Sequence, residues 1–141
     1  MHLLSLKHLV AATLLIVAPV ATRMSYPRAT VTNYEGFPAV VEVNYRSCKK
    51  DNFTVPAATR VDLAWVPGTA TASTNRGVCL ISSITASLTG DTAKVTTYTS
   101  SGTSYSQFVI RRLFCGRAGL RVWSKSEYST HNSNACFGSR R

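Results

Sequence analysis

The strongest chemical signal in the chain is a basic segment, residues 111–125, that carries five cations and no acid. If residues 118–125 form a strand, Arg121, Trp123 and Lys125 share one face, opposite Leu120 and Val122. A tryptophan between two cations can stack on a sugar or a base, or lie at a membrane interface, while the cations hold anionic groups. The alternative is that Trp123 packs beneath a loop and the cations are only solvated. The candidate binding residues are therefore Arg111, Arg112, Arg117, Arg121, Trp123 and Lys125.

Catalytic chemistry has fewer candidates. Of the three histidines, only His131 lies beyond the first ten residues, so no serine or cysteine triad follows from spacing. The six acidic residues are scattered singly, and the sequence predicts neither a metal site nor a cofactor. We therefore expect a protein that is not an enzyme. The alternative is a small secreted ribonuclease or toxin that uses His131, Glu127 and arginines, because such enzymes need only a base, an acid and a phosphate-binding cation.

The charge balance points to an acidic partner. Sixteen Lys and Arg face six Asp and Glu, a formal net charge of +10. Arginine binds phosphate, sulfate and carboxylate groups through a planar fork of donors. A net charge this far from zero favours a partner that is an anionic polymer or surface, namely a glycan, an anionic lipid or a nucleic acid. We expect such binding to serve host interaction or defence.

The N-terminus has the layout of a secretory signal peptide. Lys7 precedes an apolar run over residues 9–18, and small residues follow. The run is short for a bilayer span, which needs roughly 20 residues, although an uncleaved anchor is the alternative. We expect residues 1–21 to be removed and the protein to be secreted.

The four cysteines fit an exported chain with two disulfides. Four cysteines can pair in three ways. We favour Cys48–Cys79 together with Cys115–Cys136, because these two disulfides close loops of modest length. A zinc site is less consistent with the spacing, because no C-x-x-C pair occurs. Asn52 begins the one N-glycosylation sequon and is expected in a polar turn.

The elements that would position these residues are short strands. The central one is residues 77–88, in which Val78, Leu80, Ile84, Ala86 and Leu88 share one parity and are expected to be buried together. Around it we predict strands over residues 28–34, 39–46, 59–66, 92–100, 103–111 and 118–125, with a short edge strand at 53–55. Residues 92–111 are expected to form a hairpin, and residues 69–75 an exposed loop.

These patterns predict an all-β fold, a small disulfide-tied antiparallel β-sandwich of about seven strands. The architecture expected is immunoglobulin-like, but the family is not implied, since Leu113 stands where that family has a tyrosine two residues before a cysteine. The domain would span residues 28–125, and residues 126–141 would form a polar tail held by Cys136.

Overall fold

The computed structural model describes residues 25–113 and 119–133, the latter without the side chains of 131–133. Ten strands and one helix lie in this part of the chain: β1 (Thr30–Asn33), β2 (Ala39–Tyr45), β3 (Asp51–Val55), β4 (Thr59–Val61), β5 (Ala64–Val66), β6 (Gly68–Thr71), β7 (Ile81–Leu88), β8 (Tyr98–Thr103), β9 (Gln107–Leu113), β10 (Gly119–Ser124) and α2 (Lys125–Ser133). The expected signal peptide, Cys115, Arg117 and Cys136 lie outside the described residues.

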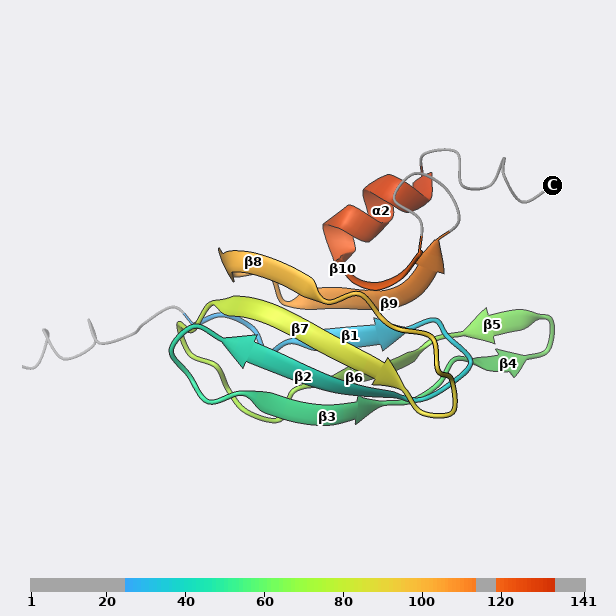
Figure 1. Cartoon of the computed structure of the whole chain (residues 1–141), viewed down its shortest axis with the longest axis horizontal. Coiled ribbons are helices and arrows are strands. Elements are labelled where there is room, and N and C mark those ends of the chain that lie inside the picture. Colours follow the sequence, from blue (N-terminus) through green and yellow to red (C-terminus); the bar gives the residue numbers. More distant parts are fainter. Residues whose placement is uncertain (1–24, 114–118, 134–141) are drawn as a thin grey trace, which may run out of the picture.

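Two four-stranded sheets pack against each other and enclose the core (Figure 1). One has the order β10-β9-β1-β6 and the other β3-β2-β7-β8. The apolar side chains between them are fully buried, among them Val31, Val43, Ile84, Ile110 and Val122. This confirms an all-β, sandwich-like fold. One pair departs from the antiparallel expectation, because β1 runs parallel to β9.

The alternation of side chains in β2 is confirmed. Val41, Val43 and Tyr45 are buried, whereas Glu42 and Asn44 lie on the wetter face. Phe108 and Ile110 of β9 also face the core as expected. In a strand such as β2, where one face alone is buried, the period-two pattern identifies the core residues directly.

The central stretch is a strand, but its register differs from the prediction. β7 begins at Ile81, and Val78 is 61 % exposed rather than buried. The pairing between β2 and β7 shifts between Asn44 and Tyr45, so that Tyr45 faces Ile81 and Ser82 is the extra residue. A bulge of this kind changes which parity points inward, and both Ile81 and Ile84 are therefore fully buried.

Three of the predicted segments are wrong. Residues 59–66 form not one strand but the hairpin β4–β5, because the chain turns at Asp62, whose φ of 56° is left-handed. Residues 68–71 form β6 rather than part of a loop. Residues 92–111 are not a hairpin, since β8 and β9 belong to different sheets.

The Cys48–Cys79 disulfide is confirmed, with Cα atoms 6.1 Å apart. It ties the chain just after β2 to the segment just before β7, so it joins neighbouring strands of one sheet at a single end.

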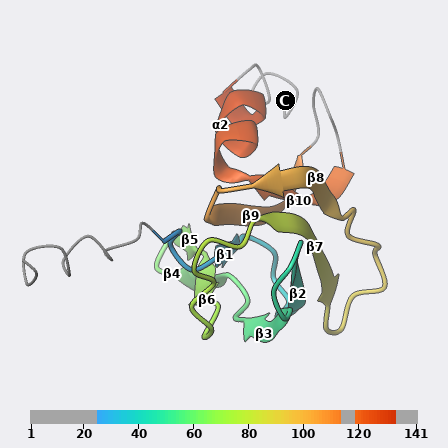
Figure 2. The same cartoon turned by 90° about the vertical axis from the view of Figure 1, so that its left-hand side faces the viewer.

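The segment that was predicted as a polar tail from residue 126 is helical as far as Ser133, because it belongs to α2. Ser124 and Glu127 form a capping box: the Glu127 N–H donates to Ser124 Oγ at 3.2 Å, and the Ser124 N–H donates to Glu127 Oε1 at 3.4 Å. This pair satisfies backbone N–H groups that the first helical turn leaves free. The helix lies on the outer side of β9 and β10 (Figure 1 and Figure 2).

Candidate ligand-binding site

The outer face of the β10-β9-β1-β6 sheet brings together three of the six predicted site residues, Arg111, Arg121 and Trp123. The register pairs Arg121 with Arg111 and Trp123 with Val109, so these four side chains share that face. Helix α2 covers this half of the face. Trp123, Val109 and Leu113 form a small second core there, against which Tyr128 of the helix packs.

The prediction of an exposed Trp123 is wrong. Its side chain is fully buried, and its indole Nε1 donates to the Arg111 carbonyl oxygen at 2.9 Å. The strand parity was assigned correctly, but the face opposite the main core is also covered, here by α2. Trp123 is therefore a core residue and has no surface to offer a ligand.

The two arginines on this face are held by aromatic rings. The Arg111 guanidinium lies 4.7 Å from the Tyr34 ring centroid and 5.8 Å from that of Tyr128, and Nη1 donates to Tyr128 Oη at 2.5 Å. Arg121 lies 5.0 Å from the Trp123 ring centroid, and its buried Nε has no hydrogen-bond partner among the described residues. Both side chains are half-buried. Arg111 thus joins Tyr34 to Tyr128 of α2, and Arg121 packs on Trp123 within β10, so both guanidinium groups have packing partners on this face without a ligand.

The rest of the predicted basic patch is dispersed. Arg112 is half-buried on the opposite parity of β9, and its backbone N–H donates to Glu35 Oε2 at 3.1 Å. Arg117 lies outside the described residues. Of the six predicted binding residues, Lys125 alone among those described lines a pocket.

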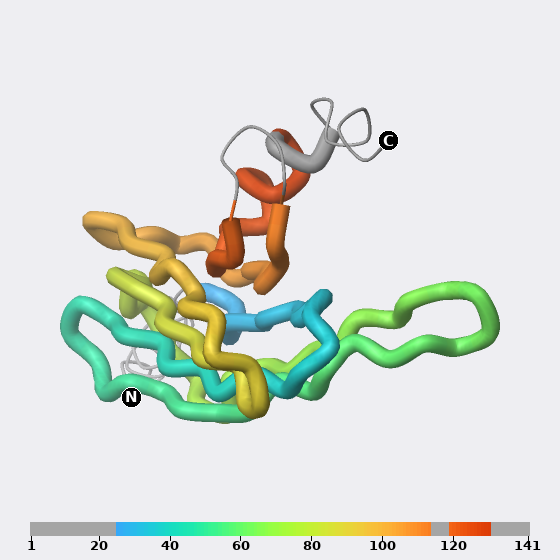
Figure 3. The backbone as a smooth tube through the Cα atoms, turned by 45° about the vertical axis from the view of Figure 1, so that its right-hand side comes forward, coloured from blue at the N-terminus to red at the C-terminus, as the bar shows by residue number. Residues whose placement is uncertain are grey.

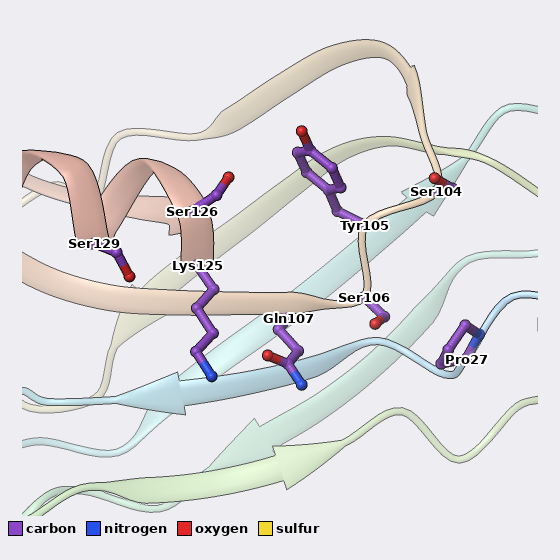
Figure 4. A pocket seen from close by; sticks show the side chains of 8 residues that line it. All are labelled: Pro27, Ser104, Tyr105, Ser106, Gln107, Lys125, Ser126 and Ser129. Atoms are coloured by element: carbon purple, nitrogen blue, oxygen red, sulfur yellow. The ribbon is translucent and has the colours of Figure 1, made fainter.

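That pocket lies between the start of α2 and the connection from β8 to β9 (Figure 4). Its volume is about 650 Å³, and the Tyr105 ring at its wall is 52 % exposed. The Lys125 amine is the cation that lines it, and the remaining polar groups are hydroxyls and one amide. The lining residues are Pro27, Ser104, Tyr105, Ser106, Gln107, Lys125, Ser126 and Ser129.

A second pocket of about 250 Å³ adjoins the first, because Gln107, Lys125 and Ser129 line both. It extends over the outer face of β1, where Thr30 and Thr32 present their side chains. The Thr30 hydroxyl forms a hydrogen bond with that of Thr71 on the neighbouring strand β6 at 3.0 Å. Together the two pockets present many hydroxyls, several aromatic rings and the side chain of Lys125, which lines both.

Arg76 holds the wall of the larger pocket in place. It is 3 % exposed, and its guanidinium donates to the carbonyl oxygens of Pro27 (2.9 Å), Ser104 (2.7 Å) and Tyr105 (3.0 Å). Burial lowers the pKa of this guanidinium from its ordinary value. Arg76 therefore fixes three residues of the lining from behind and does not itself line the pocket.

The catalytic alternative receives no added support from α2. Glu127 is engaged in the capping box, and the side chain of His131 lies outside the described part. No group of three or more His, Cys, Asp and Glu that could hold a metal ion occurs among residues 25–113 and 119–130. In the described part of the chain, no helix has the length and apolar character needed to cross a membrane.

Asn52 is exposed, but it lies in the edge strand β3 rather than in a turn. Its side chain points away from the core, on the parity opposite to the buried Asp51 and Val55. Glycosylation at Asn52 stays a prediction.

Comparison with protein-family models, with curated proteins and with solved structures finds no match. The site must therefore be interpreted from its own chemistry. Sequence reasoning missed Tyr105, Gln107 and the serines around them, because it placed residues 103–111 within one strand. The capping pair Ser124 and Glu127 was the available signal for α2, and hence for a helix beside this segment.

Proposed function

We propose that the protein is a secreted, non-catalytic binding protein whose ligand is an acidic glycan, held in the pocket between α2 and residues 104–107. The observation that carries this proposal is the composition of the lining: one ammonium group, several hydroxyls, one amide and a half-exposed tyrosine ring. Sugar hydroxyls pair with serine hydroxyls and amides, and a sugar ring packs on an aromatic face. A carboxylate or sulfate on the sugar would pair with Lys125.

The same lining argues against a nucleic acid duplex as the ligand. Several phosphates must be neutralised together for duplex binding, which needs a row of free cations. Here Arg111 and Arg121 are occupied by aromatic rings, and Lys125 is the one cation at the described pocket. A ligand with one or two anionic groups among many hydroxyls fits this lining better.

Titration calorimetry with uronate-containing and sulfated oligosaccharides, and with neutral ones, tests the proposal. Lys125→Ala should weaken binding of the acidic sugars by about tenfold or more, because a hydrogen bond to a charged group contributes about 1.5–3 kcal/mol. Lys49→Ala is the matched control, because Lys49 is exposed and lies outside the pocket. Tyr105→Ala should weaken the binding of acidic and neutral sugars alike.

Two results would refute the proposal. One is that no oligosaccharide binds the wild-type protein. The other is that Lys125→Ala and Lys49→Ala bind acidic sugars equally well. If the wild type cleaves RNA and His131→Ala abolishes this cleavage, the nuclease alternative replaces the proposal.

A further inference from the structure

The β4–β5 hairpin exposes its apolar side chains to an extent found nowhere else in the described part of the chain. Leu63 is 89 % exposed, Trp65 60 %, Val61 53 % and Val66 45 %. The hairpin projects from one end of the two packed sheets (Figure 3), and all six of its strand residues are exposed. A hairpin of two strands is only marginally stable in water, and an apolar surface of this kind marks an interaction site.

The apolar side chains surround the hairpin instead of lining one face. Arg60 pairs with Trp65 and therefore shares a face with it, whereas Val61 and Val66 belong to pairs on the other face. Leu63 lies at the turn between the strands. A strand that docks on a protein presents one apolar face to its partner. This hairpin has apolar side chains on both faces and at its turn, with Arg60 and Asp62 among them, which suits an environment that surrounds it and is part apolar and part polar.

The root of the hairpin is fixed to the sheets. The Ala58 N–H donates to the Glu35 carbonyl oxygen at 2.9 Å, and Asn33 Nδ2 donates to the Pro56 carbonyl oxygen at 3.2 Å. Asn33 is fully buried and also pairs in register with Gly68 on the far side of the hairpin. The projection is thus a preformed feature held at both of its ends.

We propose that this hairpin inserts into the boundary between headgroups and acyl chains of an anionic lipid membrane. Three-residue strands at about 3.4 Å per residue reach about 10 Å, which matches the depth of about 5–10 Å at which interfacial segments lie. Tryptophan favours this depth, and the Arg60 guanidinium, 5.9 Å from the Trp65 ring centroid, can meet lipid phosphates. The net charge of +10 attracts the protein to an anionic leaflet. Asp62 and the unpaired outer edges of the two strands keep the hairpin from the hydrocarbon centre.

The hairpin and the pocket lie at opposite ends of β1, so they can be tested separately. Thr30, at the start of β1, pairs with Gln107 of the pocket, whereas Asn33, at its end, pairs with Gly68 at the hairpin root. Lys125→Ala should weaken the binding of acidic sugars and leave lipid binding by the hairpin intact.

The experiment measures binding of the full chain to vesicles of phosphatidylcholine with phosphatidylserine, by co-sedimentation. Leu63→Ser should reduce partitioning by about tenfold or more, because burial of a leucine side chain contributes about 1.5–3 kcal/mol. Val78→Ser is the matched control, since Val78 is 61 % exposed and lies outside the hairpin. Wild type and both variants have the same N-terminus, so a difference between Leu63→Ser and Val78→Ser reports the substituted side chain alone.

Fluorescence supplies an independent measure of depth. The chain has two tryptophans, and Trp123 is fully buried, so Trp65 is the one that lipid can reach. Lipids brominated near the headgroup end of the acyl chain should quench Trp65, and Trp65→Phe should remove this quenching. Equal partitioning of Leu63→Ser and Val78→Ser, or no quenching, would overturn the proposal. A dimer that Leu63→Ser dissociates, without vesicle binding, would overturn it in favour of contact with a second copy.

Discussion

Replacement of Arg76 tests whether a buried cation bonded to backbone carbonyl oxygens organises this fold. Its guanidinium is 3 % exposed and bonds to four carbonyl oxygens, those of Pro27, Cys79, Ser104 and Tyr105, at 2.9, 3.4, 2.7 and 3.0 Å. These carbonyls come from three segments: the residues before β1, the disulfide region, and the connection from β8 to β9. A methionine fills similar space but leaves the carbonyls without a donor.

The expected loss of stability follows from these contacts. A hydrogen bond to a charged group contributes about 1.5 kcal/mol or more, so the three short ones amount to about 4.5 kcal/mol at the lower limit. Methionine also removes the cost of burying a charge, which offsets part of this loss. We therefore expect Arg76→Met to lower the free energy of unfolding by about 2 to 3 kcal/mol, and Tm by roughly 8 to 12 °C. Arg76→Lys should also lose stability, because an ammonium group cannot span the carbonyls that the planar fork reaches.

Circular dichroism melts and urea titrations measure both quantities. Arg28→Met is the control, because Arg28 is exposed in the segment just before β1. Arg76→Lys should in addition weaken the binding of acidic sugars, since Arg76 holds Ser104 and Tyr105 at the pocket wall. If Arg76→Met melts at the same temperature as Arg28→Met, the reasoning about the buried guanidinium is refuted.

The remaining predictions concern the framework. Gly68→Ala should lower Tm, because a Cβ there would lie 2.0 Å from the Pro56 carbonyl oxygen, whereas Gly36→Ala has no atom within 4 Å and should leave thermal melts unchanged. Cys48→Ser should cost about 4 kcal/mol in urea titrations, since it opens a disulfide with a sequence separation of 31. Burial raises the pKa of Tyr45, helped by its bond to a buried carboxylate. The contribution of Tyr45 to the free energy of unfolding is therefore full below about pH 10 and falls as pH rises further, because the Tyr45 hydroxyl ionises at lower pH in the unfolded chain than in the folded one. If the urea midpoints of Tyr45→Phe fall with alkaline pH as steeply as those of the wild type, this prediction is contradicted.

The core strands could be predicted from sequence where one face alone is buried. The alternation in β2 identifies Val41 and Val43. In β9, which is buried on both faces, it identifies Phe108 and Ile110 but not Val109, which is buried beneath α2. The Cys48–Cys79 pairing also followed from sequence, since it closes a modest loop in an exported chain. These features depend on local patterns and chain connectivity, which a sequence records directly.

The incorrect predictions have a common physical cause: they depend on tertiary packing, which a local sequence pattern does not encode. Trp123 was expected at the surface because nothing apolar in residues 125–133 suggested a covering helix. The bulge at Ser82 moved Ile81 into the core without any glycine or proline to mark it. Asp62 in a left-handed conformation turned an apparently continuous strand into a hairpin.

The use of the arginines decides how the net charge should be interpreted. Arg76 is buried as a bridge between carbonyls, while Arg111 and Arg121 pack on aromatic rings beside α2. A count of cations in one strand therefore overstates the free charge on that strand, because planar guanidinium groups also serve as packing elements. Lys125 lines the pocket, and Arg60 lies beside Trp65 on the exposed hairpin, so each of these two cations belongs to one of the proposed sites. Lys125 and Arg60 lie on different elements, so the pocket and the hairpin are separate sites and not one basic patch.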